Sequence, residues 1–424
     1  MGMKGKVLAV IVGVACVAAI AVTAASGATR AEPGITSNSI LIGGTFPLTG
    51  VASLYKTIPA AEKAYFDYIN DTKGGVNGRK INFEILDDAY DPSKTVPLVQ
   101  QLVQQEKVWA IFGSLGTAPG LATWDYTNTQ KVPQVFLATG DSYWGFCAYK
   151  KCGGKSYPWT INWQPDYPGE AKQYGKYIAA NMPTAKIGVL YQNDAYGKNY
   201  YAGLRVGLGA KKELIVDAES YDVTQTSLTQ QILALKAKGA DTFVIFATPS
   251  PTITALVTAT KVGWKPTTFI NNVSANRLFL LAAAGNGANV DGVISTSYVK
   301  SPTVNKSDPG MQLASQIIGK YAPALQASFD RGDTNITYGL GVAWTFVYAL
   351  GRAGKNPTRA TLVKSLHNMN TSANPFVLSG IKIQTSDKAG HRDNFPIEQE
   401  QFIKWQGGAT GDWQPFGKLL SGIR

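Results

Sequence analysis

Ile40-Leu41-Ile42-Gly43 begins a regular alternation of short apolar runs and longer amphipathic segments. Residues 60–70 and 97–106 have the apolar spacing of helices, whereas residues 81–86 and Trp109-Ala110-Ile111-Phe112 read as strands. Alternation of this kind is typical of βαβ units, in which helices connect parallel strands. This part of the chain therefore predicts a parallel sheet covered by helices.

The alternation pauses after Pro133-Gln134-Val135-Phe136-Leu137 and resumes near residue 186. The intervening residues 140–158 are rich in Gly, aromatic residues and Cys, which favours a long surface loop or crossover. The second series predicts another parallel sheet, and a cleft between two such lobes is where a ligand would sit. Its strands are expected at 186–191, 214–220 and 242–246, its helices at 196–208 and 228–238, with later helices at 311–321, 338–350 and 359–368 and a strand at 400–405.

Composition narrows the class of protein. The chain has 424 residues, of which 45% are hydrophobic and 16% charged, so it has enough apolar material for a core and enough length for two or three domains. The formal net charge is +12, but Lys and Arg do not gather in a block. We therefore expect no nucleic-acid partner.

The first residues have the layout of a secretory signal peptide. Lys4 and Lys6 precede an apolar run, residues 7–25, which ends in small residues, so cleavage is expected after Ala28. An uncleaved membrane anchor is an alternative, because the run is long enough to span a bilayer. A lipid anchor at Cys16 is another, although Gly13-Val14-Ala15 lacks the usual upstream Leu. We expect an exported protein, periplasmic or associated with the cell envelope.

Cleavage would leave Cys147 and Cys152 as the two thiols of the exported protein. An even pair in an oxidising compartment favours a disulfide. A metal site is the alternative, but it needs further ligands, and His367 and His391 lie far away in the sequence. We expect a disulfide, no metal site and no cofactor.

Catalytic motifs are not apparent. His391-Arg392-Asp393 resembles part of a kinase catalytic loop, but no Gly-rich phosphate loop with its strand lysine accompanies it. Gly-x-Ser-x-Gly, which would mark a serine nucleophile, does not occur around Ser114. The sequence therefore predicts a protein that is not an enzyme.

Gly113-Ser114-Leu115-Gly116-Thr117 lies where a strand is expected to give way to a helix. A hydroxyl and unpaired backbone N–H groups at a helix start bind a carboxylate without a buried cation. The alternative is that Ser114 and Thr117 only cap the helix.

The ordered motifs resemble the leucine/isoleucine/valine-binding protein family, the type I periplasmic solute-binding proteins that deliver ligand to ABC transporters. The resemblance runs from about residue 40 to about residue 405. The motifs are Gly43-Gly44-Thr45-Phe46-Pro47-Leu48-Thr49-Gly50, Tyr68-Ile69-Asn70, Gly74-Gly75-Val76-Asn77-Gly78-Arg79-Lys80, Asp87-Asp88-Ala89-Tyr90-Asp91-Pro92 and Asn193-Asp194-Ala195-Tyr196-Gly197.

The resemblance implies an α/β fold of two Rossmann-like lobes with parallel sheets, joined by a multi-strand hinge. It also implies an ABC permease as partner, a small-molecule ligand and a monomer. The expected organisation is a signal peptide at 1–28, lobe 1 at 36–160, lobe 2 at 161–290, a return to lobe 1 at 291–375, and a return to lobe 2 with the C-terminal tail at 376–424.

The family's ligand contacts map onto individual residues of this chain. The groups that hold the ligand carboxylate correspond to Ser114, Ala138, Thr139 and Gly140, with Thr117 beside them. The family's two tyrosines correspond to Tyr55 and Tyr196. The alternative is that the tyrosines pack on the lobe surfaces and that Ala138 belongs to the core.

Two departures from the family affect the expected ligand. Amino-acid-binding members present an acid after the strand that here reads Thr267-Thr268-Phe269-Ile270, but Asn271-Asn272-Val273-Ser274-Ala275-Asn276 contains none. Asn272 remains a candidate contact. Ala247-Thr248-Pro249-Ser250 also lacks the family's aromatic residue. Because burying an ammonium without a counter-charge is costly, we expect a small carboxylate with an apolar or aromatic body. The alternatives are a true branched-chain amino acid carrier and a ligand-sensing receptor component.

Overall fold

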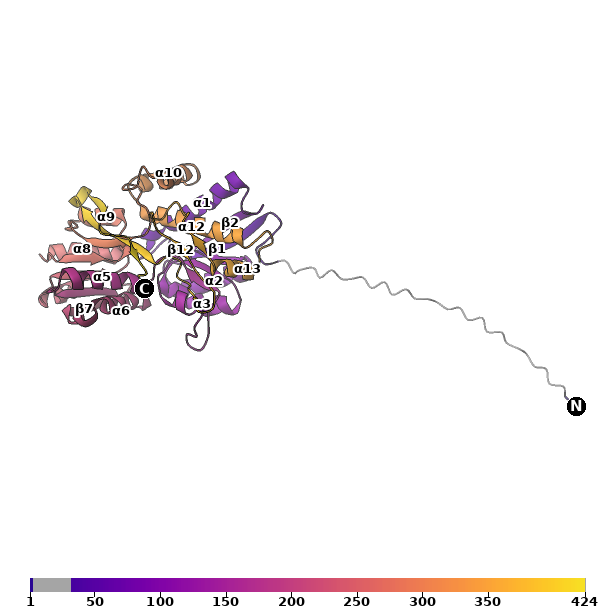
Figure 1. The fold of residues 1–424 in the computed structure, drawn as a ribbon, viewed down its shortest axis with the longest axis horizontal. Coiled ribbons are helices and arrows are strands. Elements are labelled where there is room, and N and C mark those ends of the chain that lie inside the picture. Colours follow the sequence, from indigo (N-terminus) through magenta and orange to yellow (C-terminus); the bar gives the residue numbers. More distant parts are fainter. Residues whose placement is uncertain (3–31, 424) are drawn as a thin grey trace. The chain divides into compact units, whose positions relative to one another are not determined.

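The computed structural model describes residues 1–2 and 32–423. The signal peptide and the anchors considered for it, including Cys16, lie outside the described residues. Among the described residues, no helix is long and apolar enough to cross a bilayer. Residues 32–423 contain two α/β lobes, which Figure 1 shows side by side. The predicted fold class is confirmed.

The first lobe is built on a parallel sheet with the strand order β2-β1-β3-β4-β5. Ile40 and Ile42 of β1 point to the same face of this sheet and are fully buried, as expected where helices cover that face. The strands are β1 (Ser39–Phe46), β2 (Lys80–Asp87), β3 (Ala110–Phe112), β4 (Gln134–Leu137) and β5 (Thr160–Asn162).

Helices from two distant parts of the chain belong with this lobe, and α1 packs against both α12 and α10. A cluster of edge-to-face aromatic rings, Phe66, Phe83, Phe112 and Phe346, joins helices and sheet in its core. The helices are α1 (Thr57–Lys73), α2 (Pro92–Gln104), α3 (Thr117–Thr129), α4 (Tyr143–Phe146), α10 (Pro309–Tyr321), α11 (Gln326–Asp330), α12 (Thr334–Arg352) and α13 (Arg359–Leu366), with 3-10 turns η1 (Ser53–Tyr55) and η4 (Pro323–Leu325).

Helix α2 begins earlier than the expected residue 97. Asp91 caps it by accepting a hydrogen bond from Ser93 N at 2.9 Å, and Pro92 takes the first helical position, where its missing N–H costs nothing. Pro97 therefore lies inside the helix.

The second lobe is built on a mixed sheet with the strand order β14-β13-β10-β9-β8-β6-β7. Its strands are β6 (Ile187–Gln192), β7 (Ile215–Tyr221), β8 (Thr242–Phe246), β9 (Thr267–Ile270), β10 (Ile294–Ser297), β13 (Gln399–Gln406), β14 (Asp412–Pro415) and β15 (Leu420–Ser421). Its helices are α5 (Tyr167–Asn181), α6 (Ala195–Leu208), α7 (Thr229–Ala237), α8 (Pro249–Lys261) and α9 (Arg277–Gly285), with 3-10 turns η2 (Gly209–Leu214), η3 (Asn272–Ser274) and η5 (Gly408–Thr410).

One edge of this second sheet differs from the all-parallel prediction. Strand β13 runs antiparallel to β10, and β14 pairs antiparallel with β13. The turn between β13 and β14 is too short for the crossover that parallel strands need, so a hairpin is the geometry open to it. In Figure 1 these yellow C-terminal strands lie with α8 and α9.

The connections between the lobes form the expected multi-strand hinge. Residues 163–166 lead from β5 to α5, and two later segments of the hinge pair with each other: Lys300 N donates to Phe376 O at 3.0 Å and Leu378 N to Tyr298 O at 2.9 Å. The short strands β11 (Asn370–Thr371) and β12 (Ile383–Gln384) flank the later segment and pair with each other. Because Ile383 and Ile397 belong to the core of the first lobe, we propose that the third crossing lies between Ile397 and β13, later than the expected boundary after residue 375. Because β10 pairs in the second sheet, we propose that the second crossing begins at Tyr298, a few residues later than the expected boundary after residue 290.

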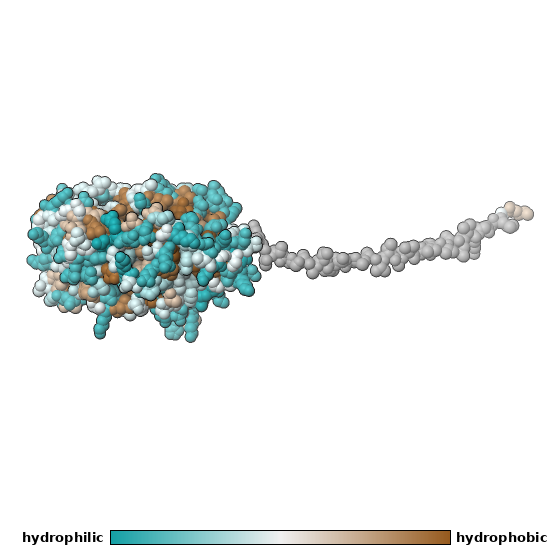
Figure 2. All heavy atoms as spheres, turned by 90° about the horizontal axis from the view of Figure 1, so that it is seen from above, coloured by the Kyte–Doolittle hydropathy of each residue, from teal (hydrophilic) through white to brown (hydrophobic). Residues whose placement is uncertain are grey.

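Most of the face drawn in Figure 2 is hydrophilic, with hydrophobic residues in scattered patches. Scattered apolar residues are normal on a soluble surface and define no site by themselves. The large hydrophobic residues exposed in the folded part are Val51, Leu54, Tyr143, Phe146, Val206, Leu233 and Val304.

Cys147 and Cys152 form a disulfide with a Cα–Cα distance of 5.7 Å. The bond closes a small loop after α4, and Cys147 packs beneath it with Trp124, Leu137 and Trp144. The bridge therefore holds the surface loop against the first lobe.

Replacing both cysteines by serine should lower the free energy of unfolding by about 2 kcal/mol, because a short closed loop removes little entropy from the unfolded chain. Urea unfolding of the parent and the double variant measures the difference. A parent protein whose unfolding midpoint does not change on reduction would contradict this expectation.

Candidate ligand-binding site

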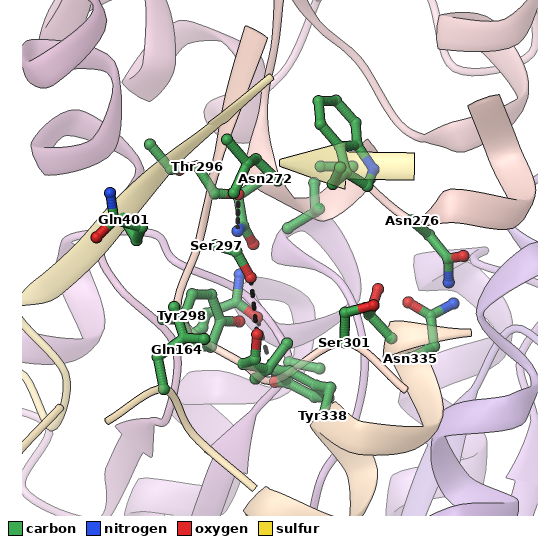
Figure 3. Close-up of a pocket in the computed structure, with 18 of the residues that line it drawn as sticks. Gln164, Asn272, Asn276, Thr296, Ser297, Tyr298, Ser301, Asn335, Tyr338 and Gln401 are labelled. Carbon is green, nitrogen blue, oxygen red and sulfur yellow. Dashed lines mark hydrogen bonds between the residues drawn. The ribbon is translucent and has the colours of Figure 1, made fainter. Parts of the chain in front are cut away.

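A cavity of about 310 Å³ lies where the carboxyl ends of the strands of both lobes meet, at the small end of the usual range for ligand pockets. In Figure 3, Asn276, Ser301 and Asn335 lie on one side and Thr296 and Gln401 on the other. Further lining residues follow most strands of both sheets, among them Tyr55, Tyr90, Gly116, Ala138, Gln164, Tyr167, Tyr196, Thr248, Asn272 and Tyr298.

Tyr55, Ala138, Tyr196 and Asn272, four of the residues expected from the sequence, line this cavity. Tyr55 lies in η1 of the first lobe and donates its hydroxyl to Val273 O of the second lobe at 3.1 Å. It therefore bridges the two lobes directly.

Tyr196 and Asn272 come from the second lobe. Asp194 caps α6 by accepting from Gly197 N at 3.2 Å, which sets Tyr196 in the first turn. The Tyr196 hydroxyl accepts from Asn271 Nδ2, so its own proton remains to be donated. Asn272 follows β9, and its Nδ2 donates to Thr296 O at 2.8 Å.

The other four expected residues, Ser114, Thr117, Thr139 and Gly140, lie behind the cavity wall rather than in it. Ser114 Oγ accepts from Thr45 N at 3.0 Å, and the hydroxyls of Thr117 and Thr139 bond each other at 2.6 Å. These groups are engaged with the protein itself.

Tyr167 covers the loop that contains Gly140. Its backbone N donates to Gly140 O at 2.8 Å, and a Cβ built on Gly140 would lie 2.6 Å from Tyr167 Cδ1. The hydroxyl faces Thr139 and Thr117. The sequence analysis missed Tyr167; the available signal was Asp166-Tyr167-Pro168, a helix start directly after a crossover.

Tyr90 is a second missed residue. Ala89 and Tyr90 have φ values of 52° and 64°, a left-handed conformation that costs non-glycine residues energy. Two carboxylates hold the turn: Asp87 accepts from Leu48 N and Ala89 N, and Asp88 accepts from Tyr90 N at 2.9 Å. The strained turn places the Tyr90 ring against Gly116, at the cavity wall.

Several tyrosine side chains lie close to the cavity wall formed by Tyr90 and Gly116, at what we call the tyrosine end of the cavity. Burial raises the pKa of each of these tyrosines, so they stay protonated. Tyr55 donates its proton to Val273 O and Tyr221 donates to Gln192 Oε1 at 3.1 Å, whereas the Tyr196 hydroxyl accepts a hydrogen bond and keeps its proton for a ligand. The group consists of Tyr55, Tyr90, Tyr167, Tyr196 and, just behind the wall, Tyr221.

Among the described residues that line the cavity, none is Lys, Arg, His, Asp or Glu. Glu170 touches the wall from behind: it accepts from Asn272 N at 2.6 Å and from the hydroxyls of Tyr174 and Tyr200 at 2.7 Å each. Burial raises the pKa of Glu170. The cavity thus offers hydrogen bonds and apolar contact without a formal charge.

Two α/β lobes joined by a hinge, with an uncharged cavity between them, are the arrangement of a receptor that binds a small solute between its lobes. The chain belongs to the periplasmic binding protein family, whose sequence profile matches residues 39–408. The family consists of solute-binding proteins, as the sequence resemblance implied.

The chain is similar to several proteins at low sequence identity. The Leu/Ile/Val-binding protein homolog 8 of Brucella abortus (strain 2308) is 22% identical over 282 residues, 64% of this chain and 67% of that protein. A fatty acid ABC transporter substrate-binding protein from Thermomonospora curvata superimposes with a TM-score of 0.76 at 20% identity, over 92% of this chain and 95% of that chain. A branched chain amino acid ABC transporter from Thermus thermophilus with bound valine superimposes with a TM-score of 0.75 at 17% identity, over 91% of this chain and 97% of that chain. At these identities the structures establish the fold.

A second contact between the lobes includes a titratable group. Asp141, which follows β4, accepts from Asn199 Nδ2 of α6 at 2.9 Å and from Tyr143 N at 2.9 Å. Burial raises the pKa of Asp141 to about 6, and the nearby charge of Asp194 acts in the same direction.

The stability of Asp141→Asn relative to the parent should therefore increase by up to about 3 kcal/mol as the pH rises from 4 to 8. The folded protein holds a proton on Asp141 more tightly than the unfolded chain, so the contribution of Asp141 is full below pH 4 and is lost as the pH rises through 6. Unfolding free energies measured from pH 4 to 8 test this. A difference between variant and parent that is the same at every pH would contradict it.

Proposed function

We propose that the protein is the exported, non-catalytic solute-binding component of an ABC importer, and that it captures a small carboxylate that lacks an ammonium group. The observation that carries the proposal is the uncharged cavity, which is lined by Tyr196 with a hydroxyl proton to donate. Residues 32–423 act as a monomer, and the permease of the importer is the partner.

The carboxylate is supported by the donors at the inner end of the cavity. Tyr196 can donate its hydroxyl proton, and Gly116 precedes the N-terminus of α3, where backbone N–H groups and the helix dipole favour an anion. Hydrogen bonds to a charged acceptor are stronger than neutral ones. A carboxylate therefore needs no cation here.

Contact of the ligand with Ser114, Thr117, Thr139 or Gly140 would require Tyr167 to move, because its ring lies over that loop. We therefore assign the first contacts with the carboxylate to Tyr90, Tyr196 and the start of α3. The four loop residues serve as a second layer that positions Tyr167.

A true branched-chain amino acid carrier is the second candidate, because a structure of similar fold contains bound valine. Its difficulty is the ligand's ammonium. The region 271–276 supplies no acid, and Glu170 already accepts three hydrogen bonds. A buried ammonium without a counter-charge is costly.

Calorimetry should show that 4-methylpentanoic acid and 4-methyl-2-oxopentanoic acid bind at least about tenfold more tightly than leucine, since the acids avoid an unpaired buried ammonium. Benzoic acid tests whether the cavity accepts an aromatic body. 4-Methylpentanamide tests whether the negative charge of the carboxylate is needed. Micromolar binding of leucine, isoleucine or valine without binding of the deaminated acids would overturn the proposal in favour of the amino acid carrier.

Tyr196→Phe should weaken binding of the acids by about tenfold, because one hydrogen bond to a charged acceptor is lost. Tyr200→Phe is the matched control, since Tyr200 lies on the same helix but donates to Glu170 outside the cavity wall. Equal affinities for Tyr196→Phe and the parent, with both proteins folded by thermal unfolding, would contradict a role of Tyr196 in binding.

A further inference from the structure

The lining of the cavity includes residues from five neighbouring strands of the second sheet. These residues include Thr248 after β8, Asn272 after β9, Thr296 in β10, Gln401 in β13 and Trp413 in β14. These five strands are neighbours in the sheet, in that order. Because adjacent strands lie about 4.8 Å apart, the lined edge spans roughly 19 Å.

We call the part of this cavity that lies away from Tyr196 the far part. It has an apolar wall. Ile403 and Trp413 are both less than one-tenth exposed, and they come from the antiparallel hairpin of β13 and β14. The hairpin, the two paired hinge segments and the residues after β14 contribute seven apolar residues to the lining: Val299, Val304, Leu378, Ile403, Trp413, Pro415 and Leu419.

The amide side chains of this part are engaged by the protein itself, whereas the indole Nε1 of Trp413 is buried and makes no hydrogen bond among the described residues. Asn276 donates to Asp333 at 2.6 Å and accepts from Leu278 N at 2.9 Å, and Asn335 donates to Leu54 O at 3.2 Å. Gln401 donates to Phe416 O, and Asn305 accepts from Ser301 N at 2.9 Å. Satisfied amides such as these require no hydrogen bond from a ligand.

We propose that the far part of the cavity is a tail subsite for an unbranched aliphatic chain, so that the preferred ligands are medium-chain monocarboxylic acids. The inference rests on the proposed function, because the carboxylate must lie at the tyrosine end, near Tyr196. The chain then extends past Asn272 toward Leu378 and Leu419.

The C-terminal segment sets the length of this subsite. Leu378 is held beside Tyr298 by the hydrogen bond between their backbones. Leu419 lies next to Gly380 in the same hinge segment as Leu378, since a Cβ on Gly380 would lie 3.0 Å from Leu419 Cδ2. Residues from three separate parts of the chain thus meet at the end of the cavity.

The first test measures calorimetric dissociation constants for propanoic, butanoic, hexanoic, octanoic and decanoic acids. The affinity should rise about fourfold for each methylene added, the ratio that corresponds to about 0.8 kcal/mol per buried CH₂, until the subsite is full. Affinities that stay level or fall beyond butanoic acid would overturn the tail subsite while leaving the proposed function intact. Failure of every acid to bind would overturn both.

The second test compares Leu419→Ser with Leu420→Ser. Both leucines are partly buried, but Leu419 lines the cavity and Leu420 packs against another cluster in the second lobe. Leu419→Ser should weaken octanoic and decanoic acids five- to tenfold and leave propanoic acid unchanged, whereas Leu420→Ser should leave the whole series unchanged. Equal losses for short and long acids in Leu419→Ser, or equal behaviour of the two variants, would overturn the assignment.

Discussion

The contact between Gly140 and Tyr167 is the constraint on which the rest of the site depends. Gly140 ends a strand loop of the first lobe, and Tyr167 starts the first helix of the second, so their hydrogen bond fixes how the chain leaves one lobe for the other. A Cβ on Gly140 would lie 2.4 Å from Pro165 O, so only glycine allows this approach. Because the Tyr167 ring also stacks on Tyr200 and meets Tyr196 edge-on, it connects the hinge with the binding surface of the second lobe.

Neutral hydroxyls and amides give this cavity a different kind of selectivity from that of a charged site. A buried cation would attract every small anion, whereas phenol donors with raised pKa values reward a ligand whose acceptors reach them. The acids of this region, Glu170 among them, are kept outside the lining by hydrogen bonds to the protein's own groups. Selectivity then depends on the geometry of a few donors and on the apolar surface that the ligand can cover.

Local sequence pattern was sufficient to predict most strands and helices, because each apolar run lies in consecutive residues. The runs around Ile42 and Val189 are examples. Motifs placed Tyr55, Ala138, Tyr196 and Asn272 at the cavity. The sequence could not place Tyr90 and Tyr167 there, since one depends on a left-handed turn and the other on where a crossover enters its helix. The antiparallel direction of β13 was likewise hidden, because β13 pairs with β10, which lies far away in the sequence.

The left-handed turn at Ala89 and Tyr90 limits how this wall of the cavity can diversify. A β-branched residue at position 90 would carry a backbone penalty that is independent of any ligand, whereas Asn, Asp and Gly would be accepted but would remove the ring. Adaptation to a new solute at this wall therefore has few single-step routes. Neighbouring walls, whose backbones are regular, are freer to vary, so divergence within such receptors should begin at the hairpin and not at the turn.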